Sequence, residues 1–240
     1  MNVAALDGVK ALTFDVFGTV VDWRSCIARE GAAFGRAQGI DLDWTAFADA
    51  WRGQYQPSME QVRSGARPWA RLDDLQRESL VGLLARHGVT GLPAEAIEQL
   101  NTAWHRLDPW PEVVAGLTRL KRRYILGTMS NGNIALMVNM AKHGGLPWDV
   151  ILGAEIAQAY KPQPECYLRG AEALGLKPGE CALVAAHNGD LHAAAKVGFK
   201  TVFVPRVTEH GPGQTKDLAV EPGIDLAVRD FQHLADLLEC

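Results

Sequence analysis

The sequence predicts an α/β protein in which a block of helices interrupts a parallel sheet soon after its first strand. Short apolar runs alternate with helical segments from about residue 124 onward, which is typical of parallel strands joined by helical crossovers. One apolar run of the same kind, residues 9–14, stands alone near the start. Residues 23–105 contain almost no strand-like run and many helix formers with apolar side chains three and four positions apart.

The first strand is expected at residues 9–14, where the apolar run ends in Asp15. Gly18 then lets the chain turn, so that Thr19 can fold back toward the carboxylate. Ligands of open α/β sheets bind at the carboxyl ends of the strands, which makes Asp15 a candidate functional residue. An aspartate in this position is also a common turn former or helix cap, and the local pattern leaves both roles open.

The helical block has apolar residues at helical spacing, for example Phe47, Trp51 and Tyr55. Glycine and proline at residues 88–93, and then two prolines within residues 108–111, mark its end. We therefore expect a core domain of residues 1–21 and 108–240, and a helical cap domain of residues 22–107.

The remaining core elements follow in a regular order. Helices are expected at residues 112–122, 134–143, 164–174, 191–197 and 231–238, and strands at residues 124–127, 150–153, 181–185, 201–204 and 224–228. Residues 205–223 are rich in glycine, proline and threonine and predict a surface loop. Together these elements predict a Rossmann-like parallel sheet core with an inserted helical cap.

The composition limits the function classes. The chain has 240 residues, 48% of them hydrophobic, and a formal net charge of -4, which argues against a nucleic-acid-binding domain. No stretch is long and apolar enough to predict a membrane span, and the start of the chain lacks the pattern of a secretory signal, so a cytoplasmic location is expected. The four cysteines are far apart and predict reduced thiols, with neither a disulfide frame nor a zinc site.

Polar side chains follow three further strand-like runs. Ser130 and Asn131 precede a helix, where they could form an anion cradle or only cap that helix. Lys161 stands before a proline in an extended segment and could reach the same edge of the sheet, although a lone lysine is normally solvated. Asp190 could cap the following helix, orient a water molecule or hold Lys161.

An Asp, a Ser, a Lys and an Asp at four successive strand ends are much less probable by chance than any one of them alone. In this respect the sequence resembles the haloacid dehalogenase superfamily. The resemblance covers essentially the whole chain: a nucleophile motif near residue 15, a helical cap inserted after it, and then the Ser, Lys and Asp motifs. It implies the haloacid dehalogenase fold.

Two positions depart from the magnesium-dependent phosphatases of this superfamily. Their first motif is DxD, in which the second aspartate acts as general acid and its backbone helps to hold the metal; that position is Phe17 here. A metal-binding aspartate about five positions before the last motif aspartate corresponds to Ala185. Magnesium requires oxygen ligands, so the sequence disfavours this class. A phosphatase with a rebuilt metal site and a non-catalytic binding protein on the same fold remain the alternatives.

The closest resemblance is to the L-2-haloacid dehalogenases of type II. Their first motif, D-x-[YF]-G-T-[LV]-x-D, matches residues 15–22, and a cap arginine preceded by tryptophan matches Arg52. Their Ser-Asn-Gly matches residues 130–132, their Lys-Pro and following tyrosine match Lys161 and Tyr167, and their final aspartate matches Asp190. Better-known members carry Ser-Ser-Asn-x-x-Asp in the fourth motif, where this chain has Ala185 and His187 at the positions of a serine and an asparagine.

The resemblance implies roles for these residues. Asp15 would attack the halogen-bearing carbon, and the catalytic set would also include Thr19, Arg52, Ser130, Lys161 and Asp190. Substrate or halide would contact Phe17, Arg52, Ser130, Asn131, Tyr167 and His187. His187 could donate to a halide or a substrate carboxylate, or be a loop histidine bonded to the backbone.

The implied reaction converts short (S)-2-haloacids into (R)-2-hydroxyacids through an aspartyl ester, with water as the second substrate. It requires no metal and no cofactor. Haloacetates and fluoroacetate are possible substrates that the sequence does not decide. By the same resemblance the chain is expected to form a homodimer.

Overall fold

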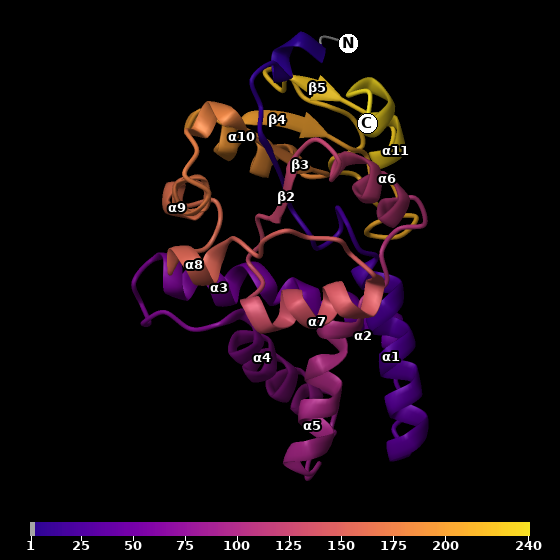
Figure 1. Ribbon diagram of the computed structural model, residues 1–240. Helices are drawn as coiled ribbons and strands as arrows, with labels where there is room; N and C mark the ends of the chain where they lie inside the picture. Colours follow the sequence, from indigo (N-terminus) through magenta and orange to yellow (C-terminus); the bar gives the residue numbers. More distant parts are fainter. Residues whose placement is uncertain (1–2) are drawn as a thin grey trace.

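The computed structural model describes residues 3–240 and contains a five-stranded parallel sheet in the order β2-β1-β3-β4-β5. The strands are β1 (Ala11–Phe14), β2 (Ile125–Thr128), β3 (Cys181–Ala185), β4 (Lys200–Phe203) and β5 (Leu226–Ala227). Figure 1 shows this sheet in one half of the molecule and most of the long helices in the other. The parallel sheet with an inserted helical region confirms the predicted fold class.

The two faces of the sheet enter different apolar clusters, because successive side chains of a strand point to opposite faces. Leu12 and Phe14 of β1 pack into the larger cluster with Phe231, whereas Ala11 packs with Tyr167. The helices of this half are η1 (Val3–Leu6), α6 (Val113–Leu120), α7 (Ile134–Gly144), α8 (Ala154–Ala157), α9 (Pro164–Ala173), η3 (Pro178–Glu180), α10 (Asn188–Lys196) and α11 (Phe231–Leu237).

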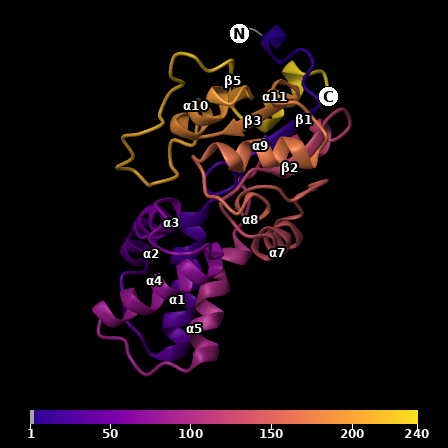
Figure 2. The ribbon, with the colours of Figure 1, turned by 90° about the vertical axis from the view of Figure 1, so that its left-hand side faces the viewer.

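The inserted block consists of α1 (Trp23–Gln38), α2 (Trp44–Gly53), α3 (Tyr55–Arg63), α4 (Leu72–Arg86), α5 (Ala94–Asn101) and η2 (Thr102–Arg106). Figure 2 shows these helices grouped together beneath the sheet. Buried Trp104 contacts Trp23 and Trp51 within the block and Phe17 from the sheet half. One continuous apolar core therefore fixes the helical block against the ends of the strands.

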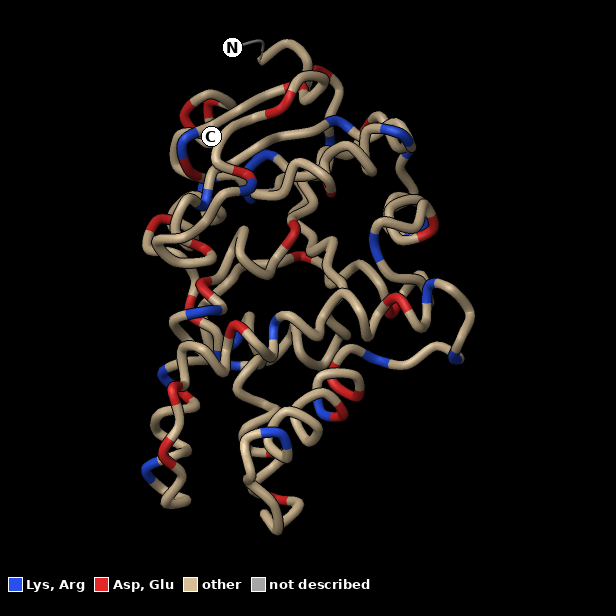
Figure 3. Tube along the Cα trace, turned by 180° about the vertical axis from the view of Figure 1, so that it is seen from behind, with Lys and Arg blue, Asp and Glu red and all other residues tan. Residues whose placement is uncertain are grey.

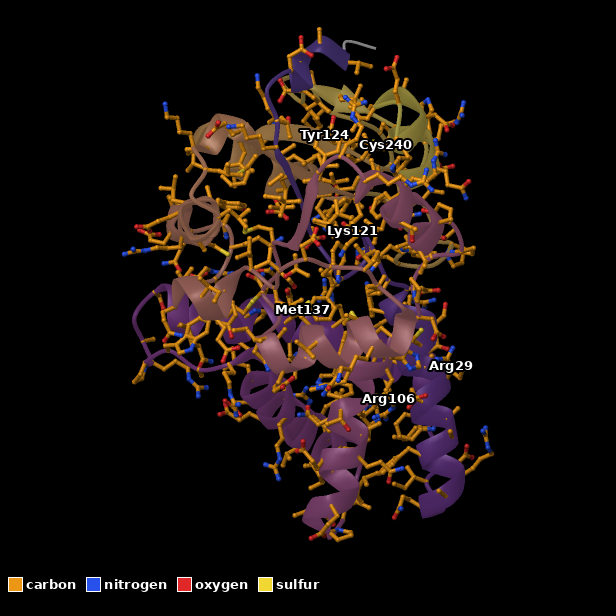
Figure 4. The ribbon with its side chains drawn as sticks, viewed as in Figure 1. Arg29, Arg106, Lys121, Tyr124, Met137 and Cys240 are labelled. Carbon is orange, nitrogen blue, oxygen red and sulfur yellow. The ribbon has the colours of Figure 1, made fainter. Side chains whose placement is uncertain are left out.

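Ion pairs at the edge of the block reinforce this arrangement. Arg29 donates to Asp108 at 2.7 Å, where the chain returns to the sheet half, and Arg106 donates to Glu30 at 2.9 Å. Figure 4 labels both arginines in the helical half, and Tyr124 and Cys240 in the sheet half. Because the side chains of both pairs are partly exposed to solvent, each pair contributes about 1 kcal/mol or less, and packing of the apolar core contributes more.

The strand expected at residues 150–153 does not form. Val150 and Gly153 pair with the neighbouring segment only through isolated bridges. A few backbone hydrogen bonds join the two segments, but at Leu152 the hydroxyl of Thr128 donates to the carbonyl and accepts from the N–H, at 2.8 and 3.0 Å, so a side chain interrupts the ladder there. The residues 205–223 are also not simply a surface loop, because Arg206 and Glu209 are buried.

Acidic and basic side chains are interspersed along the chain, as Figure 3 shows, without a long run of one sign. Within residues 3–240, no helix combines the length and the apolar character that crossing a lipid bilayer requires.

Candidate active site

Asp15 lies directly after β1, at the edge of the sheet where the carboxyl ends of the strands meet. The Thr19 hydroxyl donates to its Oδ2 at 2.7 Å and accepts from the N–H of Ala186 at 2.9 Å. Gly18, with a φ of 87°, makes the turn that brings Thr19 back. The carboxylate is therefore held in one orientation by the loop that follows its own strand.

Lys161 connects Asp15 to Asp190. Its ammonium group donates to Asp15 Oδ1 at 2.8 Å and also to Asp190 Oδ2. The hydroxyl of Tyr167 donates to the other oxygen of Asp190 at 2.6 Å. Asn131 accepts from the backbone N–H of Lys161 at 2.8 Å, which fixes the segment that carries the lysine.

These contacts determine the protonation states of Asp15 and Lys161. Burial alone would raise the pKa of Asp15, but the charge of Lys161 and the hydrogen bond from His187 lower it well below its usual range. Burial would lower the pKa of Lys161, but the two carboxylates raise it above its ordinary value. Asp15 is therefore an anion and Lys161 a cation at neutral pH, which suits a carboxylate nucleophile.

His187 lies between two carboxylates. Its Nδ1 is 3.1 Å from Asp15 Oδ2, and its Nε2 is 2.8 Å from Glu209 Oε2. Burial disfavours the charged ring, but the hydrogen bonds to Asp15 and Glu209 raise the pKa of His187 well above its ordinary value. Of the two roles considered from the sequence, backbone bonding is not observed, since both ring nitrogens contact side chains.

Glu209 was not predicted from the sequence. It lies in the long loop between β4 and β5, visible in Figure 2, and its residue is only 2% exposed. Trp23 of the helical block donates its indole N–H to Glu209 Oε1 at 2.9 Å. Gly18 leaves room for this carboxylate, because a Cβ atom there would lie 2.1 Å from Oε1. The available signal was its position: like the other site residues, it follows a strand of the sheet.

Arg52 enters from α2 in the helical block. Its guanidinium carbon lies 3.9 Å from the ring centroid of Tyr55, 5.3 Å from that of Trp23 and 5.6 Å from that of Phe17. Within residues 3–240 it forms no ion pair with a carboxylate, and its Nη1 is buried without a partner. A cation surrounded by aromatic faces and not neutralised by a carboxylate is suited to receive an anion.

These groups line a cavity of about 800 Å³ between the strand ends and the helical block. Six of the predicted residues border it: Asp15, Arg52, Asn131, Lys161, His187 and Asp190. Thr19, Tyr167, Phe17 and Ser130 lie behind this surface. Ser130 is fully buried, with its Oγ accepting from the N–H of Gly132 at 3.0 Å, so the structure does not place it against a molecule in the cavity.

The carboxylate oxygens near Asp15 bind a cation that the protein itself supplies. The Lys161 ammonium lies between Asp15 and Asp190, and Phe17 and Ala185 contribute no side-chain oxygen ligand. Among residues 3–240, one cluster brings metal-binding atom types together: His187, Glu209 and His210, within 4.8 Å of one another. Two of its members are already joined by a hydrogen bond, and the set lacks the oxygen-rich character that magnesium prefers.

Comparisons with known proteins agree with this geometry. Residues 9–198 match the family model of haloacid dehalogenase-like hydrolases. An (S)-2-haloacid dehalogenase of Pseudomonas sp. (strain YL) is 30% identical over 221 residues, covering 90% of this chain and 91% of that protein.

Two crystal structures are closer still. A defluorinating L-2-haloacid dehalogenase is 49% identical with a TM-score of 0.95, covering 97% of this chain and 96% of its own. A second L-2-haloacid dehalogenase is 45% identical with a TM-score of 0.93, covering 96% and 99%.

Proposed function

Since the chain belongs to the haloacid dehalogenase-like hydrolases, we propose that it hydrolyses the carbon–halogen bond of short (S)-2-haloacids and releases (R)-2-hydroxyacids. The observation that carries this proposal is the pairing of two groups across one cavity. Asp15 is an ionised carboxylate at one wall, and Arg52 at another is a cation that forms no ion pair with a carboxylate of residues 3–240. Displacement of a halide by a carboxylate requires both.

In the first step, an oxygen of Asp15 attacks C2 of the substrate from the side opposite the halogen, and the carbon–halogen bond breaks. Inversion at C2 follows from this direction of attack. Lys161 keeps Asp15 ionised, and Thr19 fixes its orientation. Arg52 borders the same cavity and, with the amide N–H groups of Asn131, stabilises the departing halide, because a cation and hydrogen-bond donors stabilise developing negative charge.

In the second step, water attacks the carbonyl carbon of the Asp15 ester. The bond between that carbon and the esterified oxygen breaks, and the 2-hydroxyacid leaves with an oxygen that came from Asp15. Asp190 holds Lys161 through both steps, and Tyr167 donates to Asp190. Every step uses groups of this chain and water, so we propose a metal-independent reaction with no cofactor.

The test measures halide release, in the presence of EDTA, from L-2-chloropropionate, D-2-chloropropionate, chloroacetate and fluoroacetate. A parallel assay measures phosphate release from a phosphate ester in the presence of magnesium. We expect halide from the L-isomer and chloroacetate, and none from the D-isomer. The fluoroacetate result decides whether the substrate range includes fluorine. Phosphate release that requires magnesium, without halide release, would refute the proposal in favour of a phosphatase.

The proposal extends to the organisation of the protein. We infer that residues 22–107 act as a cap domain that shields the cavity, with residues 1–21 and 108–240 as the core, although residues 1–2 lie outside the described part. We further propose a cytoplasmic homodimer. Sedimentation equilibrium of the purified protein tests the dimer directly, and a monomer at micromolar concentration would contradict it.

A further inference from the structure

The hydrolysis step needs a base for the attacking water, and the other polar groups near Asp15 are already joined to one another by hydrogen bonds or ion pairs. Both oxygens of Asp190 accept hydrogen bonds, from Lys161 and from Tyr167. Thr19 donates to Asp15 and accepts from a backbone N–H. Lys161 is a cation between two carboxylates. The fourth-motif residue that remains is His187.

We propose that His187 is the catalytic base that activates the hydrolytic water, and that Glu209 is the positioning residue that orients its ring; this rests on the proposed dehalogenase function. His187 Nδ1 lies 3.1 Å from Asp15 Oδ2, which is one bond from the carbon that water attacks. The ring also borders the cavity, with its side chain 25% exposed, so water can reach it. The opposite nitrogen is held by Glu209 at 2.8 Å.

The neighbouring charges explain why His187 acts in the second step. In the resting enzyme, the ring donates to two carboxylates and carries a proton on each nitrogen. Formation of the ester removes the negative charge of Asp15, so the cationic ring loses one of its two anionic partners. The groups that still face the ring are Glu209 directly, His210 and Arg52 near Glu209, and Lys161 and Asp190 beyond Asp15.

The protons balance over one turnover. Ester formation releases the halide, and the Nδ1 proton then leaves to solvent as the proton that dehalogenation must produce. Nδ1 next takes a proton from water as the water oxygen bonds to the Asp15 carbon. When the tetrahedral intermediate collapses, the remaining hydroxyl proton passes to the departing alkoxide. The products are the hydroxyacid, the Asp15 carboxylate and the doubly protonated ring.

Glu209 holds the ring for this task. Its carboxylate is buried and receives hydrogen bonds from His187 and from Trp23 at 2.9 Å. A carboxylate on one ring nitrogen fixes the tautomer and leaves the other nitrogen as the base. The pair of His187 and Glu209 also explains why the fourth motif departs from Ser-Ser-Asn-x-x-Asp. Ala185 supplies no hydroxyl there, and His187 with Glu209 provides a base.

The experiment compares the two chemical steps in Glu209→Gln and His187→Ala. In Glu209→Gln, the new amide can donate to Nε2, which keeps the proton on Nδ1 and removes the base while preserving shape. We expect a rapid burst of about one halide per site, and ester hydrolysis slower by roughly 10²-fold or more. Intact mass should show the substrate adduct on Asp15. In His187→Ala, added imidazole should accelerate ester hydrolysis without changing the burst.

The matched control is the exposed pair His192 and Glu221, which are also 2.8 Å apart and include a histidine of α10. His192→Ala and Glu221→Gln should retain wild-type rates of both steps. Unchanged ester hydrolysis in Glu209→Gln, or a loss confined to the halide burst, would overturn the assignment. Loss of wild-type turnover in EDTA would also overturn it, by pointing to a metal at His187, Glu209 and His210. Absence of halide release by the wild type would instead refute the proposed function itself.

Discussion

Tyr167 supports the nucleophile without touching it, which makes Tyr167→Phe an informative substitution. Its hydroxyl donates to Asp190 at 2.6 Å, and the residue is fully buried. The change deletes one hydrogen bond to a charged group and adds no volume. Such a bond contributes about 1.5–3 kcal/mol, which corresponds to a fall in melting temperature of roughly 3–12 °C for a chain of this size.

The same change should lower kcat by about 10-fold, because Asp190 then holds Lys161 with fewer constraints. Tyr160→Phe is the matched control, since it also removes a fully buried hydroxyl, which donates to the carbonyl of Ala70 at 2.8 Å. That neutral bond predicts a loss of about 0.5–1.5 kcal/mol and no change in kcat. Differential scanning calorimetry and halide release measure both. Equal stability losses in the two variants with unchanged kcat in Tyr167→Phe would refute the reasoning.

Three further predictions follow from the site. Arg52→Ala should lower kcat/KM by about 10²-fold or more, because the leaving halide loses its cation; an unchanged kcat/KM would remove Arg52 from the site. Gly18→Ala should destabilise the fold, since φ is 87° and the new Cβ would lie 2.1 Å from Glu209 Oε1; an unchanged melting temperature would contradict this. Because two carboxylates raise the pKa of Lys161 above 10.5, its charge and the stability it contributes persist at pH 10 and are lost only at still higher pH. The pH profile of kcat/KM should therefore show no fall from loss of this charge up to pH 10. A fall in kcat/KM with a midpoint below pH 10.5 that is absent from Lys161→Arg would contradict the prediction.

The parallel sheet could be predicted because its strands are short, mainly apolar runs that are visible in the local sequence. This is why β1 to β4 lie within two residues of their expected bounds. The segment 150–153 has the same apolar pattern, but both backbone groups of Leu152 bond to the hydroxyl of Thr128. That competition depends on a side chain more than twenty residues away in the sequence, so no local pattern contains it.

The candidate site also contains residues that the sequence predicts and one that it does not. Asp15, Lys161 and Asp190 were predicted to meet because parallel strands bring their carboxyl ends to one edge. Glu209 was missed because a loop rich in glycine and proline carries it, and such loops are normally exposed. Its burial results from distant partners, Trp23 in the helical block and His187 after β3. Composition alone does not encode those contacts.

The central claim is that Asp15 forms a covalent ester whose carbonyl carbon is then attacked by water. The most direct measurement is a single turnover with enzyme in excess over L-2-chloropropionate, in water labelled with oxygen-18, followed by mass analysis of the peptide that contains Asp15. If water attacks the ester, the Asp15 carboxylate gains one heavy oxygen and the hydroxyacid is unlabelled. Heavy oxygen in the hydroxyacid, with an unlabelled Asp15, would contradict it and show that water attacks the substrate directly.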